Sequence, residues 1–252
     1  TITSGSIAGG PGRVVVNAFE TPTFVATTTS GTLESLAGSR IFVSGDLANS
    51  ATLRVNTGSD AALTGVHFLS SSTISGTGSV FLRAASASEL DSALLSAAPG
   101  ATVTNALRHT IRGKGRITAA MINYGVIQAD DPAAPIEIRS AITNTGGIGA
   151  TNATLQLAGG ASITGGTLAS FGTGSVSIPA GETAGIANLA NEGSINALAG
   201  SRLRVSGSIE NNSSIAVNPT ASLLPARLRA IANTALTGSG SLVLSANPAN
   251  LD

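Results

Sequence analysis

Short alternating segments of apolar and polar residues, separated by glycine, serine or asparagine, dominate the chain. Residues 202–217 contain three such segments, with apolar side chains at Leu203, Val205, Ile209, Ile215 and Val217. Alternation with a period of two is typical of strands with one buried face, and it turns Arg202 and Arg204 outward. The Gly, Ser and Asn residues between the segments favour tight turns. Three strands and three turns in ~20 residues predict one coil of a parallel β-solenoid.

The chain also repeats itself over a long distance. Residues 37–56 read AGSRIFVSGDLANSATLRVN and residues 199–218 read AGSRLRVSGSIENNSSIAVN, so ten of twenty positions are identical at an offset of 162 residues. The same offset aligns residues 18–36 with 180–198 and residues 73–82 with 235–244. We therefore expect a single solenoid domain over residues 1–252, with an internal duplication of about residues 14–90 and 176–252.

Shorter motifs set the length of one coil. The pattern N-x-G-x-I-x-A starts at Asn123, Asn144 and Asn191, with a looser copy at Asn211. A G-x-G pattern starts at Gly76, Gly113, Gly172 and Gly238 and predicts turns. These spacings favour about eleven coils of ~20–24 residues, and parallel crossovers make a right-handed path the expectation. Asparagines at matching turns can stack in hydrogen-bonded ladders, and the candidates are Asn49, Asn123, Asn144, Asn191 and Asn211.

Two segments depart from the strand pattern. In residues 86–100, Ser86 and Glu89 form a capping box, Leu90 and Leu94 lie four apart, and a Pro-Gly pair follows. This pattern predicts one short helical excursion near residues 86–98. The sequence PARLRAIAN from Pro225 suggests a second short helix. An antiparallel sandwich is less favoured, because hairpin dipeptides and longer alternating strands are missing.

The run NALRHTIRGKGRITAAMINYGVIQAD, residues 105–130, together with the N-x-G-x-I-x-A repeats, resembles the bacterial β-strand-repeat surface proteins. These are haemagglutinin-like and autotransporter-passenger β-helices, of the kind that often carry PEP-CTERM sorting tails. The resemblance implies a right-handed parallel β-helix and an exported protein. Its motifs specify architecture and export, and they imply no activity.

Composition supports a narrow interior. Charged residues make up 10% of the chain and aromatic residues 3%, while 42% is apolar and 31 residues are glycine. Bulky rings and unpaired charges would not fit a column that repeats every ~4.8 Å. Equal numbers of basic and acidic residues, 13 each, give no reason to expect nucleic acid as a partner. The absence of cysteine excludes disulfides and thiolate metal sites.

The lengths of the apolar runs, the opening residues and the resemblance to exported proteins bear on where the protein is located. The apolar runs are shorter than the ~18–20 residues that a transmembrane helix needs. The opening residues TITSGSIAGG show no basic region followed by an apolar stretch, so we expect any signal peptide to have been removed or never present. We expect an extracellular or cell-surface protein whose signal peptide is absent from this chain.

Candidate chemistry is sparse. In an extended strand, Arg112, Lys114 and Arg116 share one face, and with Arg108 they form a possible lateral contact patch. A solvated outer face is the simpler interpretation, and contact with anionic polysaccharide or a neighbouring subunit is the alternative. Asp130 and Asp131 suggest a polar turn, and His67 and His109 suggest turn or surface positions. We predict no catalytic residue, cofactor or metal site.

These patterns favour a non-enzymatic secreted structural protein. It would build an extracellular fibre, stalk or surface matrix as a homopolymer, by head-to-tail stacking of coils. The alternative is an adhesin passenger domain that binds a surface or a glycan, such as surface polysaccharide, through a lateral face. A polysaccharide lyase or hydrolase is less favoured, because acidic residues are scattered and no Trp is present to stack on sugar rings.

Overall fold

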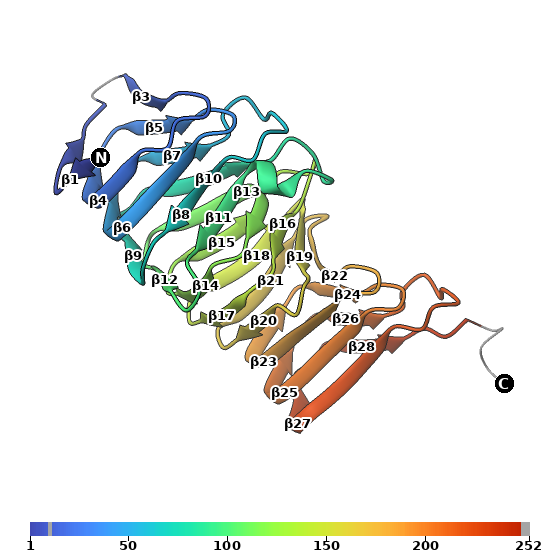
Figure 1. Ribbon diagram of the computed structural model, residues 1–252. Coiled ribbons are helices and arrows are strands. Elements are labelled where there is room, and N and C mark those ends of the chain that lie inside the picture. Colours follow the sequence, from blue (N-terminus) through green and yellow to red (C-terminus); the bar gives the residue numbers. More distant parts are fainter. Residues whose placement is uncertain (10–11, 248–252) are drawn as a thin grey trace.

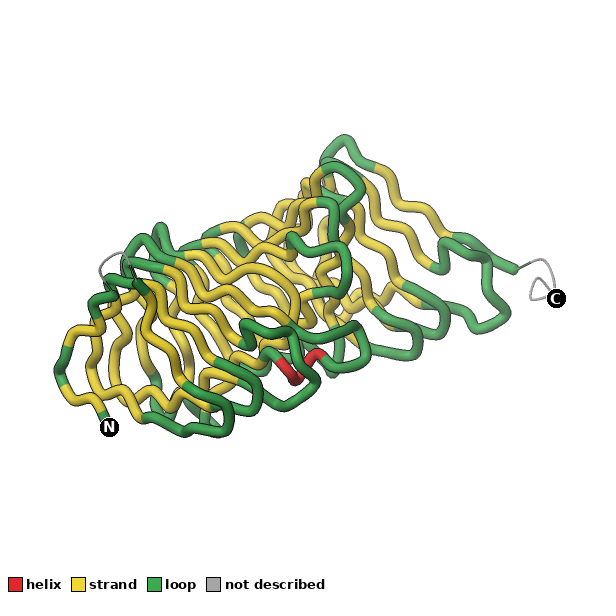
Figure 2. Tube along the Cα trace, turned by 90° about the horizontal axis from the view of Figure 1, so that it is seen from above, coloured by secondary structure: helices red, strands yellow, loops and turns green. Residues whose placement is uncertain are grey.

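The computed structural model describes residues 1–9 and 12–247 and shows an elongated stack of β-coils (Figure 1). It is a parallel β-solenoid of about 11 turns, so the predicted fold class is confirmed. Each strand pairs in parallel with the strand one coil further along the chain. The first and last coils lie at opposite ends of the stack (Figure 2).

The coil has three faces, which we call A, B and C, each a column of hydrogen-bonded strands. Face A contains β1 (Ile2–Thr3), β8 (Gly65–Phe68), β11 (Leu94–Ala97), β16 (Ile136–Ile138), β19 (Thr154–Leu157), β22 (Ser175–Ile178), β24 (Ser194–Ala197), β26 (Ser214–Val217) and β28 (Ser241–Leu244). Face B contains β2 (Ser6–Ile7), β9 (Ser72–Ser75), β12 (Thr102–Asn105), β14 (Ala120–Asn123), β17 (Ala141–Asn144) and β20 (Ser162–Thr164). Face C contains β3 (Arg13–Val16), β5 (Thr32–Ser35), β7 (Thr52–Val55), β10 (Ser79–Arg83), β15 (Val126–Ala129), β18 (Gly147–Thr151) and β21 (Thr167–Phe171).

Six longer strands bend and contribute to two faces each. They are β4 (Thr23–Thr29), β6 (Arg40–Asn49), β13 (Thr110–Ile117), β23 (Thr183–Glu192), β25 (Arg202–Asn211) and β27 (Arg227–Thr237). The bends in β6 and β25 contain Gly45 and Gly207, which are equivalent in the duplication and both have a positive φ. A left-handed residue lets the strand turn the corner without ending the parallel pairing.

Aliphatic side chains stack into columns inside the coil. One column on face C runs through Leu33, Leu53, Val80, Ile111, Ile127, Ile148 and Leu168, all of them fully buried. Another on face A runs through Ile136, Leu155, Val176, Ile195 and Ile215. The five apolar positions predicted in residues 202–217 are all buried, as expected. Each rung removes apolar surface from water, which is the main stabilising contribution to such a stack.

The two copies of the duplication keep the same internal pairing but lie on different faces. The first half of β6 pairs with β8 on face A, and the equivalent half of β25 pairs with β27 on face B. Similarly, Asn49 belongs to face B, whereas its equivalent Asn211 belongs to face C. The copies are therefore related by a step along the axis and a rotation by one face.

Buried amides form two hydrogen-bonded ladders. On face B, the amide of Asn105 donates to Asn123 and that of Asn123 donates to Asn144, with both nitrogen-to-oxygen distances 2.7 Å. Asn49 joins this ladder through His109. On face C, Asn191 donates to Asn211 at 2.7 Å. The candidate asparagines thus divide between two faces, because the duplication rotates from one to the other.

The glycines of the G-x-G motifs, Gly76, Gly113, Gly172 and Gly238, all have a positive φ. Gly76 and Gly238 are equivalent in the duplication. A Cβ atom at either would collide with a backbone carbonyl oxygen of the preceding coil, that of Asn49 or Asn211. At these two turns, glycine is required because the neighbouring coil approaches closely.

Both predicted helices are wrong. In residues 86–98 only a single 3₁₀ turn, η1 (Leu90–Ser92), forms at the side of the coil, although Ser86 does hydrogen-bond Glu89 (Figure 2). Leu94 and its successors form β11 instead, because Leu95 is buried in a column between Val66 and Ile117. The segment after Pro225 is strand β27, in register with β25. Stacking against the adjacent coil overrides the local helical preference at both places.

Candidate functional site

The predicted lateral patch is neutralised by carboxylates. Arg112, Lys114 and Arg116 all project outward from β13, as the alternation predicted. Arg112 pairs with Asp130 at 2.7 Å, and Lys114 pairs with Asp131 at 3.3 Å. Asp130 and Asp131 belong to the turn that the sequence indicated, but their carboxylates bind cations of the preceding coil.

Arg116 and Arg108 differ from Arg112 and Lys114 in the number of carboxylates that they contact. Arg116 contacts two carboxylates, with its Nε 2.6 Å from Glu137 and its Nη1 bonded to Asp91. Arg108 is exposed in a turn with a φ of 71° and is not among the ion-paired residues. The four predicted residues therefore do not form a bare cationic surface.

Ion pairs between coils recur at other places on the lateral faces. Glu34, almost fully buried, lies 2.7 Å from Arg13 and 3.0 Å from Arg54 on the two neighbouring strands. Glu137 likewise lies between Arg116 and Arg139, and its hydrogen bond raises the pKa of Arg139 above the usual range. Carboxylates thus neutralise six of the thirteen basic residues, mostly from a neighbouring coil.

Four arginines near the C-terminal end break this pattern. Arg202 is in direct register with Arg227, and Arg204 with Arg229, on the adjacent strands β25 and β27. All four are exposed, and none makes an ion pair or a side-chain hydrogen bond within the described residues. Together they line a hollow of about 220 Å³. We call these residues the arginine quartet.

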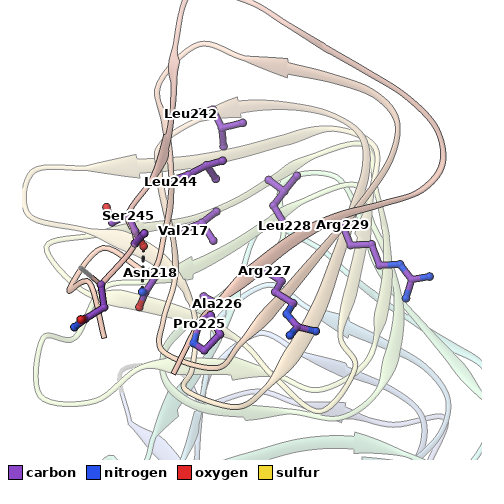
Figure 3. A pocket seen from close by; sticks show the side chains of 12 residues that line it. Val217, Asn218, Pro225, Ala226, Arg227, Leu228, Arg229, Leu242, Leu244 and Ser245 are labelled. Carbon is purple, nitrogen blue, oxygen red and sulfur yellow. Dashed lines mark hydrogen bonds between the residues drawn. The ribbon is translucent and has the colours of Figure 1, made fainter. Parts of the chain in front are cut away.

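The surroundings of the arginine quartet carry little negative charge. Thr183 and Gly185 precede Arg202 and Arg204 one coil earlier. The nearest acidic residue in the register is Glu182, whose carboxylate already contacts Arg139 at 3.4 Å and the backbone N–H of Gly159 at 2.8 Å. In Figure 3, the side chains of Arg227 and Arg229 point away from the apolar residues of their own coil.

The equivalent place in the other copy has different chemistry. Arg40, Phe42, Gly65 and His67 occupy the positions of the arginine quartet there. Phe42 and His67 pack edge to face with ring centroids 5.7 Å apart, and His67 Nδ1 lies 2.9 Å from Ser96 Oγ. These residues line a hollow of about 180 Å³. One scaffold therefore carries a cationic site in one copy and an aromatic site in the other.

The C-terminal coil, β27 and β28, leaves its interior open. Val217, Leu228, Leu242 and Leu244 line a hollow of about 550 Å³ at this end (Figure 3). Leu242 is 40% exposed and Leu244 is 68% exposed, whereas their equivalents Val80 and Leu82 are both 0% exposed. The difference arises because β11–β13 cover the earlier copy, and no described residue covers the later one.

His109 ends the turn before β13, as one of the two expected positions, but its side chain is buried rather than at the surface. Its Nε2 lies 3.0 Å from Asn49 Nδ2 and its Nδ1 lies 2.7 Å from Asn105 Oδ1. Burial lowers its pKa from 6.5 to about 4, so the imidazole is neutral near pH 7. His67 is half-buried. In the described part of the chain, no group of three or more His, Asp or Glu side chains could hold a metal ion.

The arginine quartet was not predicted from the sequence. Its signal is an R-x-R motif that occurs at Arg202 and again at Arg227, 25 residues later, which is about one coil. The helix expected after Pro225 concealed this spacing, because a helix would not place the second motif beside the first. A strand in residues 225–237 places the second R-x-R motif directly beside the first and so forms the quartet.

Within the described residues, no helix is long and apolar enough to cross a membrane. Comparisons with family models, with curated proteins and with solved structures find no match to this chain.

Proposed function

We propose that this protein is a non-enzymatic structural β-solenoid that assembles end to end into an extracellular fibre, stalk or surface matrix. The observation that supports this proposal is the open C-terminal coil. Its inward-facing Leu242 and Leu244 are solvent-exposed, and β27 and β28 each pair on one side only among the described residues. Unpaired strand edges beside exposed apolar side chains favour the addition of a further coil.

The internal duplication indicates that such a face can be covered by a further coil. The equivalent coil, β8–β10, carries the next coil in register through β11–β13. The N-terminal coil has an internal counterpart as well. Its strand β3 corresponds to β22, which stacks on the preceding strand β19. Each end coil thus has an equivalent coil inside the stack. In that equivalent coil, a neighbouring coil covers the face that is exposed at the end of the chain.

Strand direction suggests the geometry of assembly. All strands in a column run the same way, so the C-terminal face of one copy can continue the parallel ladder only with the N-terminal face of the next. Such a contact joins two different surfaces and therefore propagates. The occupant of the open coil in this proposal is a second copy of the chain.

The lateral faces support a structural role rather than a catalytic one. Asp91, Asp130, Asp131 and Glu137 are engaged in ion pairs with β13 and its neighbours. Carboxylates held in this way stabilise contacts between coils. The extracellular location rests on the resemblance of the repeats to exported β-helices, and fractionation of the source cells tests it.

Electron microscopy and sedimentation test the assembly. Negative-stain images of the purified chain should show filaments or rods of several subunit lengths, and the sedimentation coefficient should rise with protein concentration. Rods of one subunit length at the highest soluble concentration, with a constant sedimentation coefficient, would refute the proposal.

A further inference from the structure

We propose that the arginine quartet, Arg202, Arg204, Arg227 and Arg229, binds carboxylate or sulfate groups of an acidic polysaccharide. This site lies on the lateral surface of face B, and the inference does not depend on end-to-end assembly. It differs from the lateral patch predicted from the sequence, in which Arg112, Lys114 and Arg116 are already paired.

The register of β25 and β27 gives the site its geometry. Neighbouring strands place Arg202 beside Arg227 and Arg204 beside Arg229, ~4.8 Å apart at the backbone. Along each strand the two arginines are separated by about 6.6 Å. A guanidinium group binds carboxylate, sulfate or phosphate through two parallel N–H donors. The quartet therefore presents four guanidinium groups, which can bind anionic groups spaced a few ångströms apart.

The electrostatics point to a missing anion. Like charges directly opposite each other on adjacent strands destabilise a sheet. Elsewhere a carboxylate offsets this cost. Glu34 separates Arg13 from Arg54, and where Arg83 is in register with Lys114, Asp131 pairs with Lys114. The arginine quartet has no such carboxylate in the described residues, and Glu182 is engaged elsewhere. A bound polyanion would neutralise the repulsion.

The duplication shows that the coil does not need these arginines. The equivalent strands fold with Phe42, Gly65 and His67 in place of Arg204, Arg227 and Arg229. Strand pairing is the same in both copies, so the extra positive charge is not needed to form the coil.

The surface around the quartet favours an extended sugar chain over nucleic acid. Ser162 and Gly185 continue the row of Arg204 and Arg229 along face B, and they leave a low, polar path beside the cations. A nucleic acid needs a wider basic surface or aromatic side chains for its bases. The row holds neither, and the net charge of the chain is zero.

Binding of defined probes tests the inference. The probes are a sulfated polysaccharide, a polyuronate, free sulfate and duplex DNA, measured by titration calorimetry with the full chain at several salt concentrations. The test variant is Arg204→Phe with Arg229→His, which introduces the residues of the other copy. The matched control is Arg40→Thr, which removes an exposed, unpaired arginine from the strand equivalent to β25.

We expect the wild-type chain to bind at least one of the two polysaccharides, with affinity falling as salt rises. Removal of the two arginines should weaken binding about tenfold per charge, and Arg40→Thr should leave it within twofold. The same ratios should hold when Leu244→Lys is introduced to prevent assembly. Equal binding by the test variant and wild type would overturn the inference. So would free sulfate competing at the same concentration of anionic groups, or tighter binding of DNA than of either polysaccharide.

Discussion

The Nε2 atom of His109 lies 3.0 Å from the side-chain amide nitrogen of Asn49, although 60 residues separate them in the sequence. The coil between them offers no asparagine, because β9 places Ile74 in register with Asn105. His109, from the turn before β13, fills this gap. It is a fully buried imidazole that replaces one amide of the face B ladder.

The hydrogen bonds of this ladder all run in one direction. Thr29 donates to the oxygen of Asn49, so the nitrogen of Asn49 is free to donate to His109 Nε2. The N–H at Nδ1 of His109 then donates to Asn105, which donates to Asn123. This order fixes the neutral imidazole with its proton on Nδ1, and aligned bonds of this kind strengthen one another.

Replacing His109 by alanine should destabilise the coil strongly. The change leaves the oxygen of Asn105 without its partner, removes one of the two hydrogen bonds of the Asn49 amide nitrogen, which keeps its bond to the Ser79 carbonyl, and opens a cavity. We expect the free energy of unfolding to fall by about 2–4 kcal/mol, measured by urea denaturation. His67→Ala is the control, since His67 is half-buried and makes one side-chain hydrogen bond. Its cost should be about 1 kcal/mol, and equal losses for the two variants would contradict the role assigned to His109.

Acid should weaken the fold through the same residue. The pKa of His109 is about 4 in the folded chain and near 6.5 when unfolded, so the unfolded state binds the proton more readily between these values. The contribution to stability is complete above pH 6.5 and is lost as the pH falls toward 4. Between pH 7 and pH 5 we expect a loss of about 2 kcal/mol in the free energy of unfolding.

The variant His109→Gln isolates this effect. Glutamine does not titrate, so its unfolding free energy should be flatter than that of the wild type from pH 7 to pH 5. Measurements in this window avoid most of the carboxylate titrations, which lie lower. A wild-type stability that is constant from pH 7 to pH 5 would show that protonation of His109 is not linked to unfolding.

Gly113 should be far less tolerant than Gly100, although both have a positive φ. A Cβ atom at Gly113 would collide with the carbonyl oxygen of Leu82, whereas nothing lies within 4 Å of one at Gly100. We expect Gly100→Ala to cost about 1 kcal/mol, from backbone strain alone. Gly113→Ala should cost more than about 3 kcal/mol. Thermal unfolding of the two variants side by side measures the difference, and similar melting temperatures would contradict the close approach.

A charge in the open coil should block assembly without unfolding the subunit. In Leu244→Lys the ammonium group is solvated in a single subunit but would be buried beneath a second copy. We expect filaments to disappear while the free energy of unfolding changes by less than about 1 kcal/mol. Leu107→Lys adds the same charge at a turn residue that is 72% exposed, and it should assemble like the wild type. Filaments of equal length from both variants would argue against contact through this coil.

Alternation and repeats were sufficient to predict the solenoid and its interior. Leu203, Val205 and Ile215 are buried as expected, because a period of two leaves only one choice of face once a coil has formed. The helix predicted over residues 86–98 does not form. Its capping box is present, but this local hydrogen bond does not decide the structure of the residues that follow. Only the neighbouring coils, through Val66 and Ile117, show that Leu95 belongs to a strand.

The sites were harder to predict, because they depend on which coils are neighbours. Alternation correctly turned Arg112 and Lys114 outward, but their charge is cancelled by Asp130 and Asp131, about one coil later. The same reasoning explains why the burial of the His109 side chain was not predicted. Its partner Asn49 lies 60 residues earlier, and no local sequence pattern indicates that the ladder lacks an asparagine in the coil between Asn49 and Asn105.

The rotation between the two copies has a consequence for any assembly that repeats this unit. Because Asn49 and Asn211 occupy different faces, equivalent side chains do not line up in a stripe along the axis. Each further unit would turn its lateral groups by another third of a revolution, so three units would point in three directions. A fibre built on this rule would distribute equivalent lateral groups helically around its axis, so that every side of the fibre carried them in turn.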